Sequence, residues 1–457
     1  MKVIQGLASV LLLLPWCAWA QSETTSQRAD ESQMQGMGQM DVSSGKKGAG
    51  MEHRHPENFR EEIVHHTSSG TSAEPNSTPT PMLMGMKRQW EFMFHANVFL
   101  TDLQQSSKRG ADRFFSTNWF MGMAQHQAGP GTLTARAMFS LEPATVTSRR
   151  YPLLFQQGET AFGLPIVDGQ HPHDFIMELA AFYDVKVGKN SLLSFYFAPM
   201  GDPAMGPTAY PHRASAMENP VAALGHHQQD STHIADDVVT VGYTHRILRL
   251  EASGFHGREP DEIRWDIDSG KLDSWSTRFT LQPGKNWSGQ YSYSRITSPE
   301  ALFASEDQER MTASVMYNRT LGDWKSGPGN WASTALWGRT RSLRDDSIFT
   351  SYLFESTLRF LTRNYAWTRV ENTDRSNELL FGETTLPPGF REERIGRVQA
   401  YTFGFAHDFD MIPHVASAVG LQFTTYGVPG ILQPIYGSRP VGGVVFLRCR
   451  PFSGADR

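Results

Sequence analysis

Apolar and polar residues alternate with a period of two along most of this chain, and this alternation constrains the fold more than any other feature. In the first such segment Trp90, Phe92 and Phe94 fall on one face, while Met93 and His95 fall on the other. A β-strand turns successive side chains to opposite faces of its sheet. Charged residues make up only 19% of the chain, which argues against a soluble sandwich with a charged outer face. The pattern predicts an all-β chain that forms a transmembrane antiparallel β-barrel.

The number of strands follows from counting these segments and the connections between them. We expect about 16 strands, within a range of 14 to 18, centred near residues 95, 120, 137, 182, 195, 241, 252, 277, 291, 315, 336, 354, 367, 402, 420 and 446. Long and short connections alternate almost throughout, as the outer loops and periplasmic turns of outer-membrane barrels do. The longest connections, 144–176 and 200–236, are expected to be the second and third outer loops.

Residues 1–20 have the layout of a secretory signal peptide. Lys2 supplies the positive charge, residues 7–14 form a short apolar core, and residues 18–20 give a small-residue cleavage site. Removal of this segment would leave Cys449 as the single cysteine, so we expect no intramolecular disulfide.

Residues 21–87 are polar, rich in Ser, Thr, Gly and Pro, and without any period, so we expect a disordered periplasmic tail. Spaced methionines in such a tail offer thioether ligands to Cu(I), and paired histidines suit Cu(II), Ni(II) or Zn(II). The alternative is an inert polar linker. The candidate metal ligands of the tail are Met34, Met37, Met40, His53, His55, His65 and His66.

Six histidines lie between Gln170 and Asp237, with carboxylates among them. Imidazole and carboxylate are ligands for borderline-soft divalent metals. His171 and His173 are two residues apart, so in an extended segment both imidazoles would lie on one side. The spacing matches no specific zinc or copper motif, and a structural histidine network or no special role are the alternatives. The candidate ligands are His171, His173, His212, His226, His227, His233 and Asp230.

Residues 88–452 resemble Gram-negative outer-membrane β-barrels of the porin type, and residues 453–457 form a short C-terminal tail. Such barrels usually end on an aromatic residue; here the last strand leads to Phe452, but Pro451 and the tail depart from that pattern. The resemblance implies that the third outer loop folds inward and narrows the lumen. The order of signal, Met/His-rich tail and barrel also resembles the copper resistance protein B family, which implies copper as the metal.

These features favour an outer-membrane channel for metal ions or small solutes, with lipid and possible periplasmic metal-resistance proteins as partners. The alternative is a non-conducting barrel whose tail and loops sequester metal. The net charge of −5 gives no support for nucleic-acid binding. No Gly-x-Ser-x-Gly motif is present, so we expect transport or binding rather than catalysis. The 67 polar residues before the first strand are too few for the folded plug of a TonB-dependent receptor.

Overall fold

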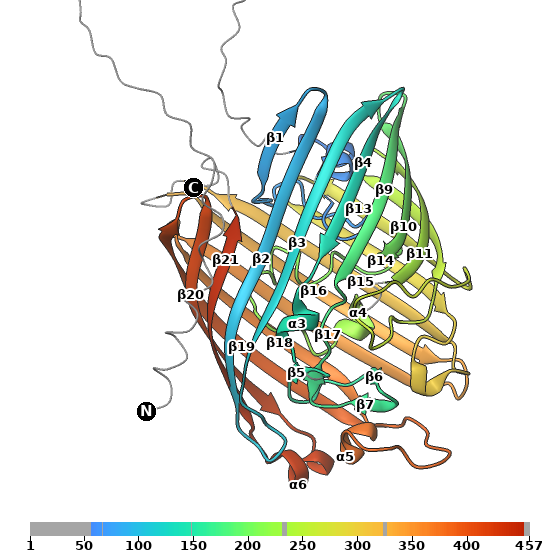
Figure 1. Ribbon diagram of the computed structural model, residues 1–457, viewed down its shortest axis with the longest axis vertical. Coiled ribbons are helices and arrows are strands. Elements are labelled where there is room, and N and C mark those ends of the chain that lie inside the picture. Colours follow the sequence, from blue (N-terminus) through green and yellow to red (C-terminus); the bar gives the residue numbers. More distant parts are fainter. Residues whose placement is uncertain (1–55, 66, 148, 231–234, 323–326, 452–457) are drawn as a thin grey trace, which may run out of the picture. The chain divides into compact units, whose positions relative to one another are not determined.

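We describe a computed structural model of the chain, which defines residues 56–65, 67–147, 149–230, 235–322 and 327–451 (Figure 1). The expected signal peptide, residues 21–55 of the expected tail, and residues 453–457 lie outside the described residues. Among the described residues, no helix is both long enough and apolar enough to cross a bilayer.

Seventeen of the described strands form one large sheet. One of them, β1 (Leu83–Lys87), pairs with β2 but is not part of the closed ring of strands. The other 16 close into a barrel, because the last strand pairs with the first, Val98 lying opposite Cys449. This confirms the predicted fold class and strand count. The ring consists of β2 (Trp90–Gln105), β3 (Arg113–Ala128), β4 (Gly131–Phe139), β9 (Ile176–Val187), β10 (Ser191–Gly201), β11 (Ala235–His245), β12 (Leu248–His256), β13 (Ser274–Gly284), β14 (Trp287–Ile296), β15 (Gln308–Leu321), β16 (Gly329–Ser342), β17 (Ile348–Phe360), β18 (Asn364–Ser376), β19 (Arg394–Ile412), β20 (Val415–Gly427) and β21 (Val441–Pro451).

The alternation in sequence corresponds to the two faces of the barrel wall. In β14, Trp287 and Tyr291 are exposed on the outer face, whereas Ser288 and Ser292 are buried on the inner face. Aromatic and aliphatic side chains cover the outside of the other strands in the same way. An apolar outer band, a polar interior and an even number of antiparallel strands define an outer-membrane β-barrel of the porin type.

Short turns join the strands at one end of the barrel and long loops at the other, as the connection lengths predict. Gly129 and Gly188 have positive φ angles of 58° and 68° in two of the short turns, where glycine turns the chain without a steric penalty. The long loops carry the remaining short elements, namely α3 (Glu142–Thr145), β5 (Tyr151–Pro152), β6 (Glu159–Ala161), β7 (Leu164–Ile166), β8 (Gly169–Gln170), α4 (His226–Gln229), η1 (Ala301–Phe303), α5 (Glu378–Phe381), η2 (Gly430–Leu432) and α6 (Gln433–Tyr436).

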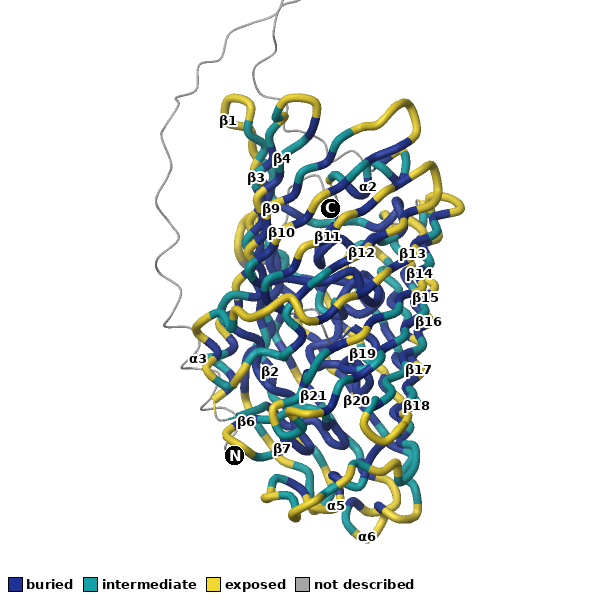
Figure 2. The backbone as a smooth tube through the Cα atoms, turned by 90° about the vertical axis from the view of Figure 1, so that its right-hand side faces the viewer, coloured by how far each residue is buried: buried dark blue, intermediate teal, exposed yellow. Residues whose placement is uncertain are grey.

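The third outer loop folds into the lumen, as expected from the porin resemblance. Figure 2 shows the buried course of the inner segments between the strands. Arginines of the wall hold this loop from several sides: Arg278 Nη1 donates to the Gly206 carbonyl at 3.1 Å, and Arg369 Nη1 to the Val221 carbonyl at 3.1 Å. Each guanidinium donates a hydrogen bond to a backbone carbonyl that is buried away from water. These hydrogen bonds stabilise the loop inside the charged lumen.

The N-terminal segment also enters the barrel, which corrects the expected tail boundary at residue 87. After α2 (Phe59–His65), residues 67–78 are mostly buried. Arg136 Nη1 donates to the Thr67 carbonyl at 2.7 Å, and Arg278 Nη2 donates to Thr71 Oγ1 at 2.9 Å. The Ser and Thr residues that suggested disorder bond instead to polar groups of the wall and of the third loop.

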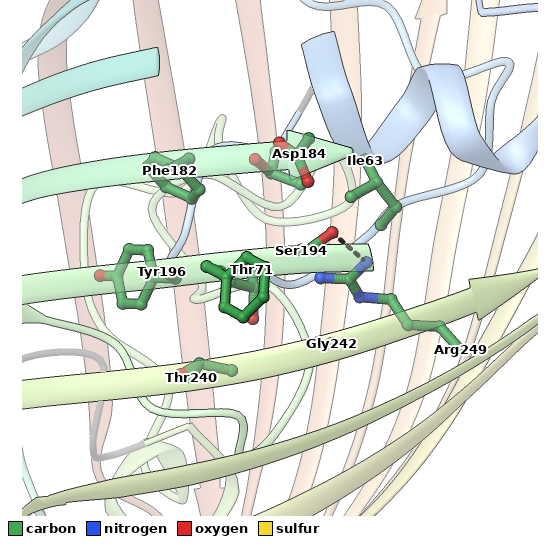
Figure 3. A pocket seen from close by; sticks show the side chains of 11 residues that line it. Ile63, Thr71, Phe182, Asp184, Ser194, Tyr196, Thr240, Gly242 and Arg249 are labelled. Atoms are coloured by element: carbon green, nitrogen blue, oxygen red, sulfur yellow. Dashed lines mark hydrogen bonds between the residues drawn. The ribbon is translucent and has the colours of Figure 1, made fainter. Parts of the chain in front are cut away.

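Figure 3 shows where this segment meets strands β9 to β11. Ile63 of α2 and Thr71 line a small pocket together with Asp184 and Ser194 of the wall. Arg249 Nη1 donates to Ser194 Oγ at 3.2 Å beside them. The N-terminal segment and the third loop together occupy the interior of the described barrel.

Candidate functional site

Three of the inner loop residues converge at one point. Glu159 lies in β6, His171 follows β8, and His227 lies in α4, which belongs to the third loop. His171 Nε2 lies 3.2 Å, and His227 Nε2 3.1 Å, from the same carboxylate oxygen, Oε1 of Glu159. One donor atom from each residue lies within 4.8 Å of the others, which is the arrangement of a three-ligand metal site. The side chains are nearly buried, at 8–11% exposure.

The backbone fixes the orientation of both imidazoles. His171 Nδ1 lies 2.8 Å from the Pro172 carbonyl, and His227 Nδ1 lies 3.3 Å from the Gln157 carbonyl. A carbonyl oxygen only accepts hydrogen bonds, so each Nδ1 carries the proton as the donor. In a neutral ring, this tautomer leaves the lone pair on Nε2, the atom that faces Glu159. Metal-binding histidines are commonly held in this way by a hydrogen bond at the other nitrogen.

Burial determines the charge state of His227. It lowers the pKa of this side chain to about 4, and the neighbouring His171 opposes a positive charge as well, although Glu159 acts in the other direction. His227 is therefore uncharged at neutral pH. Burial opposes the charge of Glu159, but the neighbouring His171 lowers the pKa of this carboxyl well below its usual value, so the carboxylate is ionised. An ionised carboxylate beside two imidazole nitrogens has the charge and the donor atoms of a cation-binding site.

Buried carboxylates surround the site on its outer side. A cavity beside His227 is lined by Glu300 and Glu392 from two outer loops, with Arg310 and Arg375 as the cations. Burial raises the pKa of Glu300, and the nearby Glu392 raises it further. Burial likewise raises the pKa of Glu392 to about 7. A raised pKa favours the protonated, neutral form, so these carboxyl groups contribute little negative charge beside the site at neutral pH.

The remaining predicted loop ligands lie near the site but are divided among other partners. His173 Nδ1 lies 2.9 Å from Glu142 Oε2, and its ring centroid lies 6.4 Å from that of His171, so the two imidazoles do not converge on one point. Burial opposes a charge on His173, but Glu142 raises its pKa above the usual value. His226 Nε2 lies 2.7 Å from Gln170 Oε1.

Asp230 and His212 lie further from the three-ligand site. Asp230 pairs with Arg213 at 3.2 Å, and Arg213 in turn binds Glu355 of the wall at 2.6 Å. His212 packs on Trp119, with ring centroids 4.3 Å apart. His233 lies outside the described residues.

The tail ligands remain predictions. Met34, Met37, Met40, His53, His55 and His66 lie outside the described residues. His65 ends α2 and lines a pocket at the turn end of the barrel together with His126.

No sequence pattern marks Glu159 as a ligand, because it lies in a long loop between a glycine and a threonine. Methionines at inner positions of β2 to β4 were also missed, although their signal was present. Met93 and Met138 fall on the polar face of their strands, where Ser, Thr or Gln is usual.

The chain matches no known protein family and no curated protein. Its fold is similar to solved porin structures. The Salmonella typhi OmpF complex with daunomycin has a TM-score of 0.48 and 8% identity, and the match covers 80% of this chain and 100% of that one. The anion-selective porin from Comamonas acidovorans has a TM-score of 0.46 and 9% identity, covering 79% and 99%. The channel DcaP of Acinetobacter baumannii has a TM-score of 0.41 and 10% identity, covering 80% and 100%.

Proposed function

We propose that this outer-membrane barrel handles transition-metal ions and binds a divalent cation between Glu159, His171 and His227. The observation that supports this is the pair of Nε2 atoms facing one carboxylate oxygen at 3.2 and 3.1 Å. Two imidazoles and one carboxylate suit Zn(II), Cu(II) or Ni(II), and leave a coordination position for water or a transported ligand.

Two modes of action remain, passage and sequestration. As a channel, the barrel would pass metal ions or small solutes once its inner segments move. As a sequestering barrel in a metal-resistance system, it would hold the ion and conduct nothing. The occupied lumen favours sequestration, because residues 67–78 and the third loop bond to the wall from several sides. Copper is the metal implied by the resemblance to the copper resistance protein B family, with periplasmic metal-resistance proteins as partners.

The test is divalent-metal binding by the full chain in detergent. The variant His171→Ala with His227→Ala should lose one tight equivalent of Zn(II). Its affinity should fall by more than about 100-fold, because loss of an outer hydrogen-bond partner alone costs a metal site roughly 10- to 100-fold. The matched control is His407→Ala, an exposed histidine on β19. Its bound Zn(II) should equal that of the wild type.

Folding is checked separately by gel migration with and without heating, since closed barrels resist SDS. Equal Zn(II) binding by the wild type and a correctly folded double variant would refute the site. Stepwise currents in planar bilayers would support passage, and their absence would support sequestration.

A further inference from the structure

The barrel interior contains one apolar patch made almost entirely of methionine. Seven of its eight buried residues are methionine, and the eighth is Trp119. The largest apolar cluster of the described residues has 26 buried members, and none of them is methionine. Both clusters fill space inside the same barrel. If the patch served packing alone, its composition should resemble that of the larger cluster, which uses aromatic and aliphatic side chains.

Strand register places three of the potential ligands side by side on one level of the wall. His95 of β2 lies opposite Met121 of β3, and Met121 lies opposite Met138 of β4. Directly opposed residues share a face, with their Cβ atoms about 4.5–5.5 Å apart. All three side chains are buried, and His95 Nε2 lies 3.1 Å from Met121 Sδ. One imidazole nitrogen and two thioethers therefore meet on one level.

The next level toward the turn end repeats the arrangement with three thioethers. Met84 of β1 lies opposite Met93 of β2, and Met93 lies opposite Met123 of β3. These three residues also line a surface pocket, together with small residues such as Gly122.

We propose that these two levels form a binding site for a soft monovalent metal ion, Cu(I) or Ag(I). Thioether sulfur is a soft ligand that selects Cu(I) over the harder divalent ions, and imidazole nitrogen binds it as well. The proposed ligands are His95, Met121 and Met138 on one level and Met84, Met93 and Met123 on the other. A carboxylate is absent from both triads, which separates this site chemically from the one at Glu159.

The site does not depend on the proposed divalent site. His95 packs edge-on against Trp119 at 4.9 Å between centroids, and Trp119 packs on His212 at 4.3 Å. His212 belongs to the same inward loop as His227, so this loop contacts the soft site through a different residue from the one that it places at Glu159.

The test measures Ag(I) bound by the full-length protein in detergent, with Ag(I) as a redox-stable substitute for Cu(I). Met121→Leu with Met138→Leu keeps the size and apolar character of the patch but removes two sulfurs. This variant should lose one bound equivalent of Ag(I) relative to the wild type. Met316→Leu is the matched control, because Met316 is buried on β15 outside the patch. It should bind as much Ag(I) as the wild type.

If the double variant does not fold, a second measurement on the wild-type protein tests the proposal. In wild-type protein labelled with carbon-13 at the methionine methyl groups, Ag(I) should shift the signals of the five methionines of the site. Unchanged Ag(I) binding by the folded double variant would overturn the proposal, as would shifts confined to methionines outside the patch. Zn(II) binding by the double variant should equal that of the wild type, so failure of this site is distinguishable from failure of the site at Glu159.

Discussion

At the scale of single residues, Glu159 has a role that composition and spacing do not reveal. Histidines are visible in a sequence as potential ligands, but a lone glutamate in a long loop is not. Its position depends on β6, which brings its carboxylate between His171 of the second loop and His227 of the third. Two of the predicted loop ligands thus meet at a carboxylate that could not be predicted, while His173 pairs with Glu142.

The variant Glu159→Gln tests the charge of this side chain. It keeps the shape of the side chain but removes the negative charge, which burial opposes and the neighbouring His171 stabilises. Without metal, the variant should be less stable than the wild type by about 1 kcal/mol, because a hydrogen bond to an ionised group is stronger than a neutral one by about that amount. Its Zn(II) affinity should fall, because an anionic ligand is lost. Thermal unfolding with and without Zn(II) measures both effects. A variant that is as stable as the wild type without metal and binds Zn(II) normally would contradict this assignment.

At the scale of elements, the sequence predicted the barrel wall well and its contents poorly. All 16 predicted strand centres fall within ring strands, because wall residues alternate between lipid and lumen and leave a local signal of period two. Residues 67–78 have no such signal. Their burial depends on distant partners such as Arg136 and Arg278, so a Ser/Thr-rich segment that looks disordered finds its hydrogen bonds inside the barrel.

Docking of this inner segment should depend on pH through Glu74. Burial, with a smaller contribution from the neighbouring Glu62, raises the pKa of this carboxyl from 4.5 to about 8. Between pH 4.5 and about pH 8, the carboxyl of Glu74 is therefore protonated in the docked state and ionised in the released state. Docking should be strongest below the lower pKa and should weaken as the pH rises toward the upper one. Hydrogen exchange of residues 67–78, corrected for intrinsic rates, should show this loss of protection.

The control for this prediction is Glu74→Gln, which cannot ionise. Its protection should vary much less between about pH 5 and about pH 9, where the wild type changes most. Protection in the wild type that rises with pH, or an equal dependence in the variant, would show that Glu74 does not control docking.

At the scale of the whole molecule, the closed ring and its contents are separable. A 16-stranded ring is wide enough to leave an aqueous channel when its interior is empty. Here the third loop and the N-terminal segment are bonded to the wall. Ring closure itself uses only β2 and β21, which pair without the inner segments.

Removal of the N-terminal inner segment should therefore open the lumen without opening the ring. A variant that lacks residues 56–81 keeps β1 and every ring strand, so it should still resist SDS before heating. Its conductance in planar bilayers should exceed that of the wild type, because polar groups such as Arg136 and Arg278 would then face water instead of the segment. A variant without residues 21–55 is the control, and its conductance should equal that of the wild type. If the two variants conduct equally, the inner segment does not limit passage, and the third loop alone would set the constriction.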